Sequence, residues 1–211
     1  MIRLMASEIA SALQANLIGD DIAIASVSTD SRQIKAGDLF IALQGPNFDG
    51  HRFVDEVIAQ GAIALVVNRQ LPVAVPQIVV EDTRIALGQL GALVKAKVAP
   101  KTVAVTGSAG KTTVKEMLAA ILSRIGQVLA PAGNFNNDIG VPLTLLRLEP
   151  QHKFAVIELG ANHLGEIAYT SSLVKPDVAM ITNVAAAHIE GFGDLFGVAR
   201  AKGEIYSGLS D

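Results

Sequence analysis

A glycine-rich loop followed by a lysine and two threonines is the part of this sequence best suited to chemistry. Residues 102–113 read TVAVTGSAGKTT and lead into a helical pattern, an order in which loop N–H groups and the helix dipole converge on an anion. Gly107 and Gly110 allow positive φ and a close approach of phosphate oxygens to the backbone. Lys111 offers a cation to the β- and γ-phosphates, and Thr112 offers a hydroxyl to Mg²⁺. The predicted ATP-binding residues are Gly107, Ser108, Ala109, Gly110, Lys111, Thr112 and Thr113.

The loop departs from the common phosphate-loop pattern G-x-x-x-x-G-K-[ST], because Val105 stands where that pattern has its first glycine. The alternative interpretation is a glycine-rich βα turn with a solvated lysine. The apolar run, both glycines, the Lys-Thr-Thr sequence and an amphipathic helix all agree with phosphate binding, so we favour a nucleotide site.

Three further polar side chains lie in the second half of the chain. Glu158 ends an apolar run, and in open α/β sheets ligands bind beyond the carboxyl ends of the strands, where a carboxylate can hold Mg²⁺. An ion pair or a cap at the strand end is the other interpretation of Glu158. His188 follows the next strand, although a lone histidine is more often structural than a ligand. Lys202 reads, from its neighbours alone, as an ordinary surface lysine on a helix.

The elements that must position these residues form an α/β pattern. Apolar or β-rich runs at 24–28, 39–43, 63–67, 78–80, 102–106, 154–159 and 178–182 predict strands. Helical patterns separate most of them. One apolar stripe on a predicted helix 111–125 comprises Val114, Met117, Leu118, Ile121, Leu122 and Ile125. Strands that are nearly all apolar favour a parallel sheet covered on both faces, so the second half is predicted to be doubly wound.

Composition limits the class of protein. The chain has 211 residues, 50% of them hydrophobic, with a formal net charge of −3 and no cysteine. The charge disfavours a nucleic-acid binder, and the absence of cysteine excludes disulfides and thiolate zinc sites. The longest apolar runs are far shorter than the roughly 20 residues of a membrane span, and Glu8 interrupts the start where a signal peptide would be apolar. We expect a soluble, cytoplasmic protein with no membrane partner.

Charge also suggests two domains. Residues 1–82 carry 5 Lys and Arg against 10 Asp and Glu, whereas residues 83–211 carry 12 against 10. We therefore predict a domain boundary between residues 82 and 83. From residue 102 onward the pattern offers three or four strands where a doubly wound sheet usually has about five or six, so the second domain is small or part of something longer.

Taken together, these segments resemble the Mur ligase family, ATP-dependent ligases that build the peptide of the bacterial cell-wall precursor. The matching segments are VTGSAGKTTVKEM from Val105, GNFNNDIGVPLTLLRL from Gly133, VIELGANHLGEIA from Val156, NVAAAHIEGFG from Asn183 and AKGEIYSGL from Ala201. The shortened phosphate loop is typical of that family. Residues 28–53 resemble the uridine-nucleotide domain of its tripeptide-stage and pentapeptide-stage members. ELGANH and AAAHIEGFG favour the member that joins D-Ala-D-Ala to UDP-MurNAc-tripeptide.

The resemblance implies roles for individual residues. Lys111, Glu158, His188 and Lys202 are the implied catalytic residues, and Thr112, Glu158, His188 and Lys202 the implied ligands of two Mg²⁺ ions, Lys202 after its neutral amine has reacted with CO₂ to form a carbamate. Ser31, Arg32, Asn47 and Phe48 match positions that contact uridine diphosphate. Asn134, Asn136, Asn137, Asn162 and His163 match positions that face the muramoyl peptide.

The implied reaction converts the substrate carboxylate to an acyl phosphate with ATP, and the amine of D-Ala-D-Ala then displaces phosphate. In that family a third domain follows. We therefore expect a truncated α/β fragment, a uridine-nucleotide domain over 1–82 and a partial ATPase domain over 83–211, that does not ligate alone. We expect the full-length protein to be a monomer, whereas an uncovered sheet edge would let the fragment self-associate.

Three other functions stay open at this stage. A folylpolyglutamate-synthase-like ligase would share the phosphate loop and the carbamate lysine but has no evident need for residues 28–53. A non-catalytic uridine-nucleotide binder would show no metal-dependent ATP affinity. A generic phosphotransferase would more often place an aspartate, not Glu158, at the strand end.

Overall fold

The chain folds into two compact units, Met1–Leu93 and Val94–Asp211. The computed structural model describes residues 1–131, 133, 135–186 and 189–210. The predicted boundary at 82/83 coincides with the start of helix α3 (Thr83–Val98), whereas the division of the structure lies inside that helix. The reason is that Ile85 and Gln89, in the first turns of α3, line a cavity together with Leu13 of the first unit.

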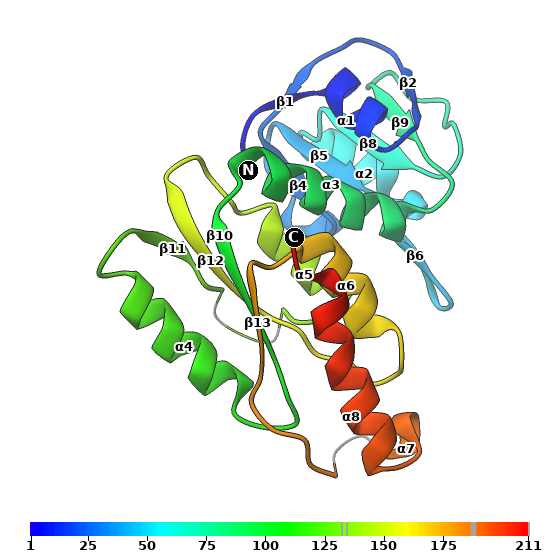
Figure 1. The fold of residues 1–211 in the computed structure, drawn as a ribbon. Coiled ribbons are helices and arrows are strands. Elements are labelled where there is room, and N and C mark those ends of the chain that lie inside the picture. Colours follow the sequence, from blue (N-terminus) through cyan, green and yellow to red (C-terminus); the bar gives the residue numbers. More distant parts are fainter. Residues whose placement is uncertain (132, 134, 187–188, 211) are drawn as a thin grey trace. The chain divides into compact units, whose positions relative to one another are not determined.

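The first unit is built on a five-stranded sheet (Figure 1). Its strands, in spatial order, are β2 (Asn16–Ile18), β9 (Gln77–Val79), β8 (Ala64–Val67), β5 (Asp38–Ile41) and β4 (Ser26–Ser28). Strands β9, β8, β5 and β4 run parallel to one another, whereas β2 pairs with β9 in the antiparallel direction. The smaller elements are β1 (Leu4–Met5), α1 (Ala6–Ala12), β3 (Ala23–Ile24), η1 (Ser31–Gln33), β6 (Gln44–Gly45), β7 (Phe48–Asp49) and η2 (Gly50–Phe53).

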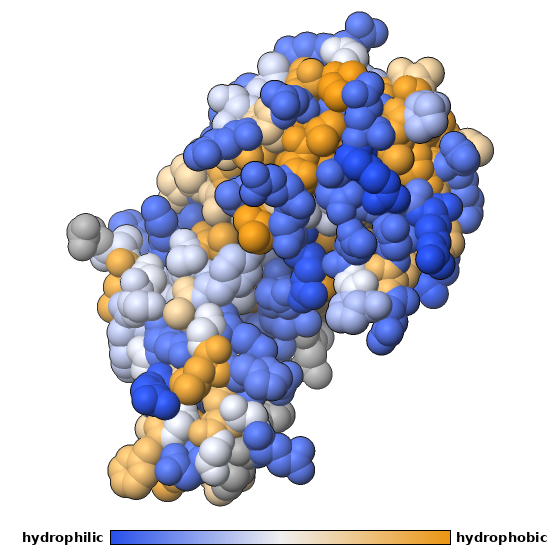
Figure 2. Space-filling view, turned by 90° about the vertical axis from the view of Figure 1, so that its right-hand side faces the viewer, coloured by the Kyte–Doolittle hydropathy of each residue, from blue (hydrophilic) through white to orange (hydrophobic). Residues whose placement is uncertain are grey.

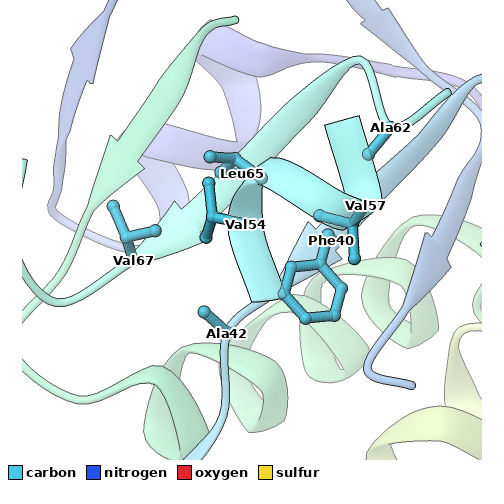
Figure 3. Packing of buried hydrophobic residues seen from close by; sticks show 7 residues of the cluster. All are labelled: Phe40, Ala42, Val54, Val57, Ala62, Leu65 and Val67. Atoms are coloured by element: carbon cyan, nitrogen blue, oxygen red, sulfur yellow. The ribbon is translucent and has the colours of Figure 1, made fainter. Parts of the chain in front are cut away.

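The core of this unit lies between the sheet and helix α2 (Val54–Gln60) (Figure 3). The ring of Phe40 points from β5 toward Val57 of the helix, and Leu65 approaches from β8. All three side chains are almost completely removed from solvent. Burying an apolar side chain of this size stabilises a fold by about 1.5–3 kcal/mol, which explains why the predicted apolar runs became the central strands.

The second unit contains a four-stranded, wholly parallel sheet in the order β11 (Gln127–Leu129), β12 (His152–Glu158), β10 (Lys101–Thr106) and β13 (Val178–Ile181). Helix α4 (Lys111–Leu122) packs on one face, and α5 and α6 lie on the other side of the sheet in Figure 1. This confirms the predicted doubly wound α/β class. The remaining helices are α5 (Gly140–Leu145), α6 (Glu166–Val174), α7 (Ile189–Phe192), α8 (Leu195–Gly203) and η3 (Glu204–Gly208).

Helix α4 differs from its predicted packing. Met117, Ile121 and Ile125 of the expected apolar stripe are 60–66% exposed, whereas Lys115 is completely buried. The inward face therefore comprises Lys115 and the half of the predicted stripe that is partly buried, namely Val114, Leu118 and Leu122.

Among the residues that the structure describes, no helix is both long and apolar enough to span a bilayer. Hydrophobic and hydrophilic residues are intermixed over the face shown in Figure 2.

Candidate nucleotide and metal site

The glycine loop lies between β10 and α4, at the carboxyl end of the parallel sheet. Gly107 and Gly110 have φ of 147° and 78°, the region in which a side chain is strained. A Cβ on Gly107 would also overlap the hydroxyl of Thr182, which donates a hydrogen bond of 2.6 Å to the carbonyl of Ala109. The predicted need for glycine is thus confirmed at residue 107, by conformation and by space.

The segment after β13 holds this loop in place. Asn183 accepts from two loop amides, with its backbone carbonyl from Ser108 N at 3.1 Å and with its side-chain Oδ1 from Ala109 N at 3.0 Å. The hydroxyl of Ser108 donates to the carbonyl of Ala185 at 3.0 Å. Two of the amides predicted to hold phosphate therefore already donate within the protein, which sequence reasoning did not anticipate.

Lys111 and Thr112 begin helix α4. The ammonium of Lys111 donates to the carbonyl of Gly107 at 2.8 Å, so the cation folds back over the loop. The hydroxyl of Thr112 donates to Glu158 Oε2 at 2.9 Å, and Asn136 Nδ2 donates to Oε1 of the same carboxylate at 3.1 Å. The loop, the helix start and the end of β12 thus meet at Glu158, as predicted from strand order.

These residues suit a magnesium ion. Glu158 is only 5% exposed and sits at the end of β12, and its oxygens and the Thr112 hydroxyl are the hard donors that Mg²⁺ prefers. Within the described residues, no three His, Cys, Asp or Glu side chains gather closely enough to form a metal centre by themselves. His188 and Asn134, two of the predicted site residues, lie outside the described part of the chain.

Lys202 is buried, not on the surface, with 2% of the residue exposed. Burial, together with the positive charge of Lys111, lowers the pKa of the Lys202 amine, although Glu166 and Glu204 act in the opposite direction. Its ammonium lies 5.6 Å from the centre of the Phe192 ring. A lysine with a lowered pKa has a larger neutral fraction, and the neutral amine is the form that attacks CO₂.

A cavity of about 190 Å³ brings many of the predicted residues together. It is lined by Gly107, Ser108, Lys111, Asn136, Asn137, Gly160, Ala161, Asn162, Glu166 and Lys202. His163, predicted for the same region, has a largely exposed side chain and does not line it.

Glu166 is a member of this cavity that sequence reasoning missed. It accepts from Asn162 N at 2.8 Å and lies 3.0 Å from Nδ1 of His163. Burial alone would raise the pKa of Glu166, but these hydrogen bonds lower it overall and keep the carboxylate charged. No local pattern marked Glu166, because its backbone partner, Asn162 N, precedes the helix, whereas the N–H groups of Gly165 and Ala168 at the start of α6 donate to Glu204.

A second candidate site lies in the first unit. A cavity of about 620 Å³ is lined by Thr29, Asp30, Ser31, Arg32, Phe48, Phe53 and Glu56. Three of the four predicted uridine-nucleotide residues, Ser31, Arg32 and Phe48, are among them, whereas Asn47 lies in the turn between β6 and β7 and is not.

Two side-chain contacts organise this site. The rings of Phe48 and Phe53 stack with centroids 5.9 Å apart, which forms an aromatic wall of the kind that binds a planar base. The guanidinium of Arg32 donates to both oxygens of Asp30 at 2.8 Å, and this holds the pKa of Asp30 at about 2.

Comparison with known proteins agrees with the family resemblance of the sequence and with the fold. Residues 105–211 match the family model described as Mur ligase middle domain, and residues 23–125 match that described as Mur ligase family, catalytic domain. The chain belongs to the Mur ligase family.

Several individual members of this family are similar to the chain. The chain is 56% identical over its whole length to UDP-N-acetylmuramoyl-tripeptide--D-alanyl-D-alanine ligase of Escherichia coli, of which it covers 47%, and 55% identical to the protein of that name from Haemophilus influenzae. A crystal structure of MurF from Acinetobacter baumannii has a TM-score of 0.95 at 46% identity, with 100% of this chain and 47% of that chain covered. MurF ligase from Thermotoga maritima, in complex with ADP, has a TM-score of 0.79 at 32% identity, with 88% and 43% covered. The chain thus spans about half the length of the curated relatives it matches.

Proposed function

We propose that this protein supplies the ATP site and the uridine-nucleotide site of a cytoplasmic ligase that joins D-Ala-D-Ala to UDP-MurNAc-tripeptide in peptidoglycan precursor synthesis. The observation that carries the proposal is the junction of Lys111, Thr112 and Glu158 beside the buried amine of Lys202. The names of the relatives at 55–56% identity support the choice of substrates.

The proposed chemistry has two steps. A carboxylate oxygen of the tripeptide attacks the γ-phosphorus of ATP, which forms an acyl phosphate and releases ADP. The neutral amine of D-Ala-D-Ala then attacks the acyl carbon to form a tetrahedral intermediate. Phosphate leaves as the C–O bond to it breaks, and the nitrogen gives one proton to solvent, which leaves an amide. Lys111 opposes the repulsion between the two anions in the first step and stabilises negative charge on the transferring phosphoryl group.

Mg²⁺, when bound, would neutralise phosphate charge, and Thr112 and Glu158 are the residues that would hold it. We assign His188 and Lys202, the latter as a carbamate, to a second ion, because the lowered pKa of Lys202 favours the amine that CO₂ requires. Asn136, Asn137 and Asn162 line the cavity and would contact the muramoyl peptide, as would Asn134 and His163.

The first unit, in this proposal, holds the uridine diphosphate. Phe48 and Phe53 offer a stacking surface for uracil, and Arg32 and Ser31 lie beside it for the pyrophosphate. Replacing Phe48 by Ala should weaken binding of UDP-MurNAc-tripeptide by about tenfold and leave ADP binding unchanged, since stacking of one base contributes about 1–3 kcal/mol.

The deciding experiment is a chimaera in which these 211 residues replace the matching part of the Escherichia coli ligase. We expect phosphate release that requires UDP-MurNAc-tripeptide and D-Ala-D-Ala together, and its loss in Lys111→Met. Isothermal titration of the chain itself adds a second measurement. Binding of UDP-MurNAc-tripeptide without any Mg²⁺-dependent affinity for ADP would instead indicate a non-catalytic nucleotide binder.

A further inference from the structure

Lys115 is a completely buried lysine that the proposed chemistry does not use. It lies on α4, one turn beyond Lys111 and Thr112. Its ammonium donates to the carbonyl of Pro131 at 2.6 Å and lies 3.3 Å from a carboxylate oxygen of Glu116, whose own side chain is mostly exposed. A buried charge is costly unless it is hydrogen-bonded, so the fold holds Pro131 against this helix.

The chain beyond Pro131 returns to the carboxylate of the site. Asn136 is fixed at two points, because its carbonyl accepts from Gly160 N at 2.8 Å and its side chain donates to Glu158 at 3.1 Å. A Cβ on Gly160 would lie only 2.9 Å from the amide carbon of Asn136, so the two segments are in close contact. Asn137 then accepts from Gly140 N at 2.7 Å, at the start of α5.

These contacts close a circuit that begins and ends on α4. Thr112 bonds to Glu158, Glu158 to Asn136, and five residues before Asn136 the carbonyl of Pro131 bonds to Lys115. Helix α4 thus contacts the carboxylate directly through Thr112, and it also holds Pro131, which lies five residues before the second partner of that carboxylate, Asn136. Partners of a metal-binding carboxylate set its orientation and the affinity of its metal.

We propose that Lys115 is a positioning residue: it anchors Pro131 to α4, so that Asn136 reaches Glu158 and holds the carboxylate in the orientation that binds the nucleotide-associated metal. The metal-binding role of Glu158 rests on the proposed function. The placement of Asn136 by Lys115 does not, and the two can be tested separately.

The first measurement is ADP affinity of the 211-residue chain, by titration calorimetry, with Mg²⁺ and with EDTA. In Lys115→Met the gain in affinity that Mg²⁺ provides should fall about tenfold, whereas the affinity in EDTA should change less than about twofold. Asn136→Ala should give the same loss, and the double variant no further loss, because both act through one contact to Glu158. The matched control is Lys95→Met, which removes another lysine-to-carbonyl bond, 2.9 Å to Lys175, near the opposite end of the sheet.

The second measurement is amide hydrogen exchange, which needs no ligand. The N–H of Gly160, bonded to Asn136, should exchange at least about tenfold faster in Lys115→Met than in the wild type and be unchanged in Lys95→Met, with thermal melting recorded for each variant. If Lys115→Met does not melt cooperatively, Lys115→Gln takes its place with the same readouts, because its amide nitrogen ends one bond short of the lysine ammonium and cannot hold Pro131 at the same distance from α4.

The outcomes separate the two proposals. Unchanged exchange at Gly160 in a folded Lys115 variant overturns the positioning role, as does a loss of Mg²⁺ dependence equal to that of Lys95→Met. If the wild-type chain binds no ADP with Mg²⁺, the proposed function fails, while faster exchange at Gly160 still supports the placement of Asn136 by Lys115.

Discussion

Two buried lysines in the second unit have opposite surroundings. Lys115, fully buried on α4, places its ammonium 2.6 Å from a backbone carbonyl. Lys202, 2% exposed on α8, lines a cavity beside Lys111, and burial with that neighbouring charge lowers its pKa. Burial alone therefore does not identify a reactive amine. A lysine paired with a carbonyl stabilises and positions, whereas one held beside a second cation in a cavity is available for chemistry.

The largest expected effect is on turnover. In the chimaera with the Escherichia coli ligase, Lys202→Met should lower kcat by about 10³-fold, since it removes a proposed metal ligand and its charge. Lys115→Met should cost only about tenfold, as a contact acting through another residue does. If a phosphate-release assay shows a similar loss of kcat in both variants, the two lysines do not differ in their contribution to turnover.

Lys111 provides the next test, because its positive charge is one of the causes of the lowered pKa of Lys202. Lys111→Met should weaken ADP binding by about 10- to 100-fold, as expected from the loss of one charged hydrogen bond. It should also raise the pKa of Lys202, since the Lys111 charge lowers it. NMR titration of the lysine ε-groups would detect that rise, and a lower or unmoved Lys202 pKa would contradict the assigned cause.

The same two substitutions should affect the free energy of unfolding in the reverse order, with the larger loss in Lys115→Met. Lys115→Met leaves a buried carbonyl without its donor and should lower the free energy of unfolding by about 1–3 kcal/mol. Lys202→Met replaces a poorly solvated cation by an apolar chain of similar length, so stability should stay the same or rise by about 1 kcal/mol. Urea unfolding of both variants measures this, and equal destabilisation would argue that Lys202 is also a structural lysine.

The smallest effect is the pH dependence of that stability difference. Because the folded chain holds the pKa of Lys202 below 10.5, the unfolded chain binds more protons between the lowered pKa and 10.5. The stability of the wild type should therefore rise with pH across this window relative to Lys202→Met. Urea unfolding at several pH values from 7 upward checks the sign. A wild-type free energy of unfolding that falls with rising pH, relative to Lys202→Met, would contradict the lowered pKa of Lys202.

The exposed edge of the second sheet predicts self-association of the chain. Strand β13 is an edge of the second sheet, and Val178 and Met180 are 55% and 41% exposed along it. Such an edge can pair with another copy. Light scattering over a micromolar concentration range should detect dimers. A constant monomer mass would exclude pairing through β13 in that concentration range.

The fold was predictable where apolar runs are long. The strands near 39–43, 64–67, 102–106 and 154–158 were found because most of their residues are buried and apolar. The strand 178–181 was found from its apolar sequence, although two of its four residues are exposed. The run 24–28 was predicted as one strand but forms β3 and β4, which pair in different sheets. Strands β2 and β11 were missed, since each has three residues and an exposed polar residue at its start. Such strands depend on partners far away in the sequence, which local patterns do not contain.

The site was predictable where chain order determines position. Lys111, Thr112 and Glu158 were found because a glycine loop and a strand end both lie at the carboxyl edge of a parallel sheet. Lys202 looked like a surface residue, since its burial results from tertiary packing of α8. Lys115 was missed although it shares a helix face with Leu118 and Leu122, a pattern in which a lysine among apolar neighbours could have indicated burial.

The two hydrogen bonds that Asn183 accepts from the glycine loop affect the affinity of this loop for a phosphate group. The two oxygens of Asn183 already occupy the N–H groups of Ser108 and Ala109, so phosphate oxygens that use those donors exchange one set of hydrogen bonds for another. The net gain is smaller than the contacts of a bound nucleotide would suggest. In the function that we propose, Asn183 would compete with the nucleotide for these two N–H groups, which would lower the affinity for ADP and favour its release.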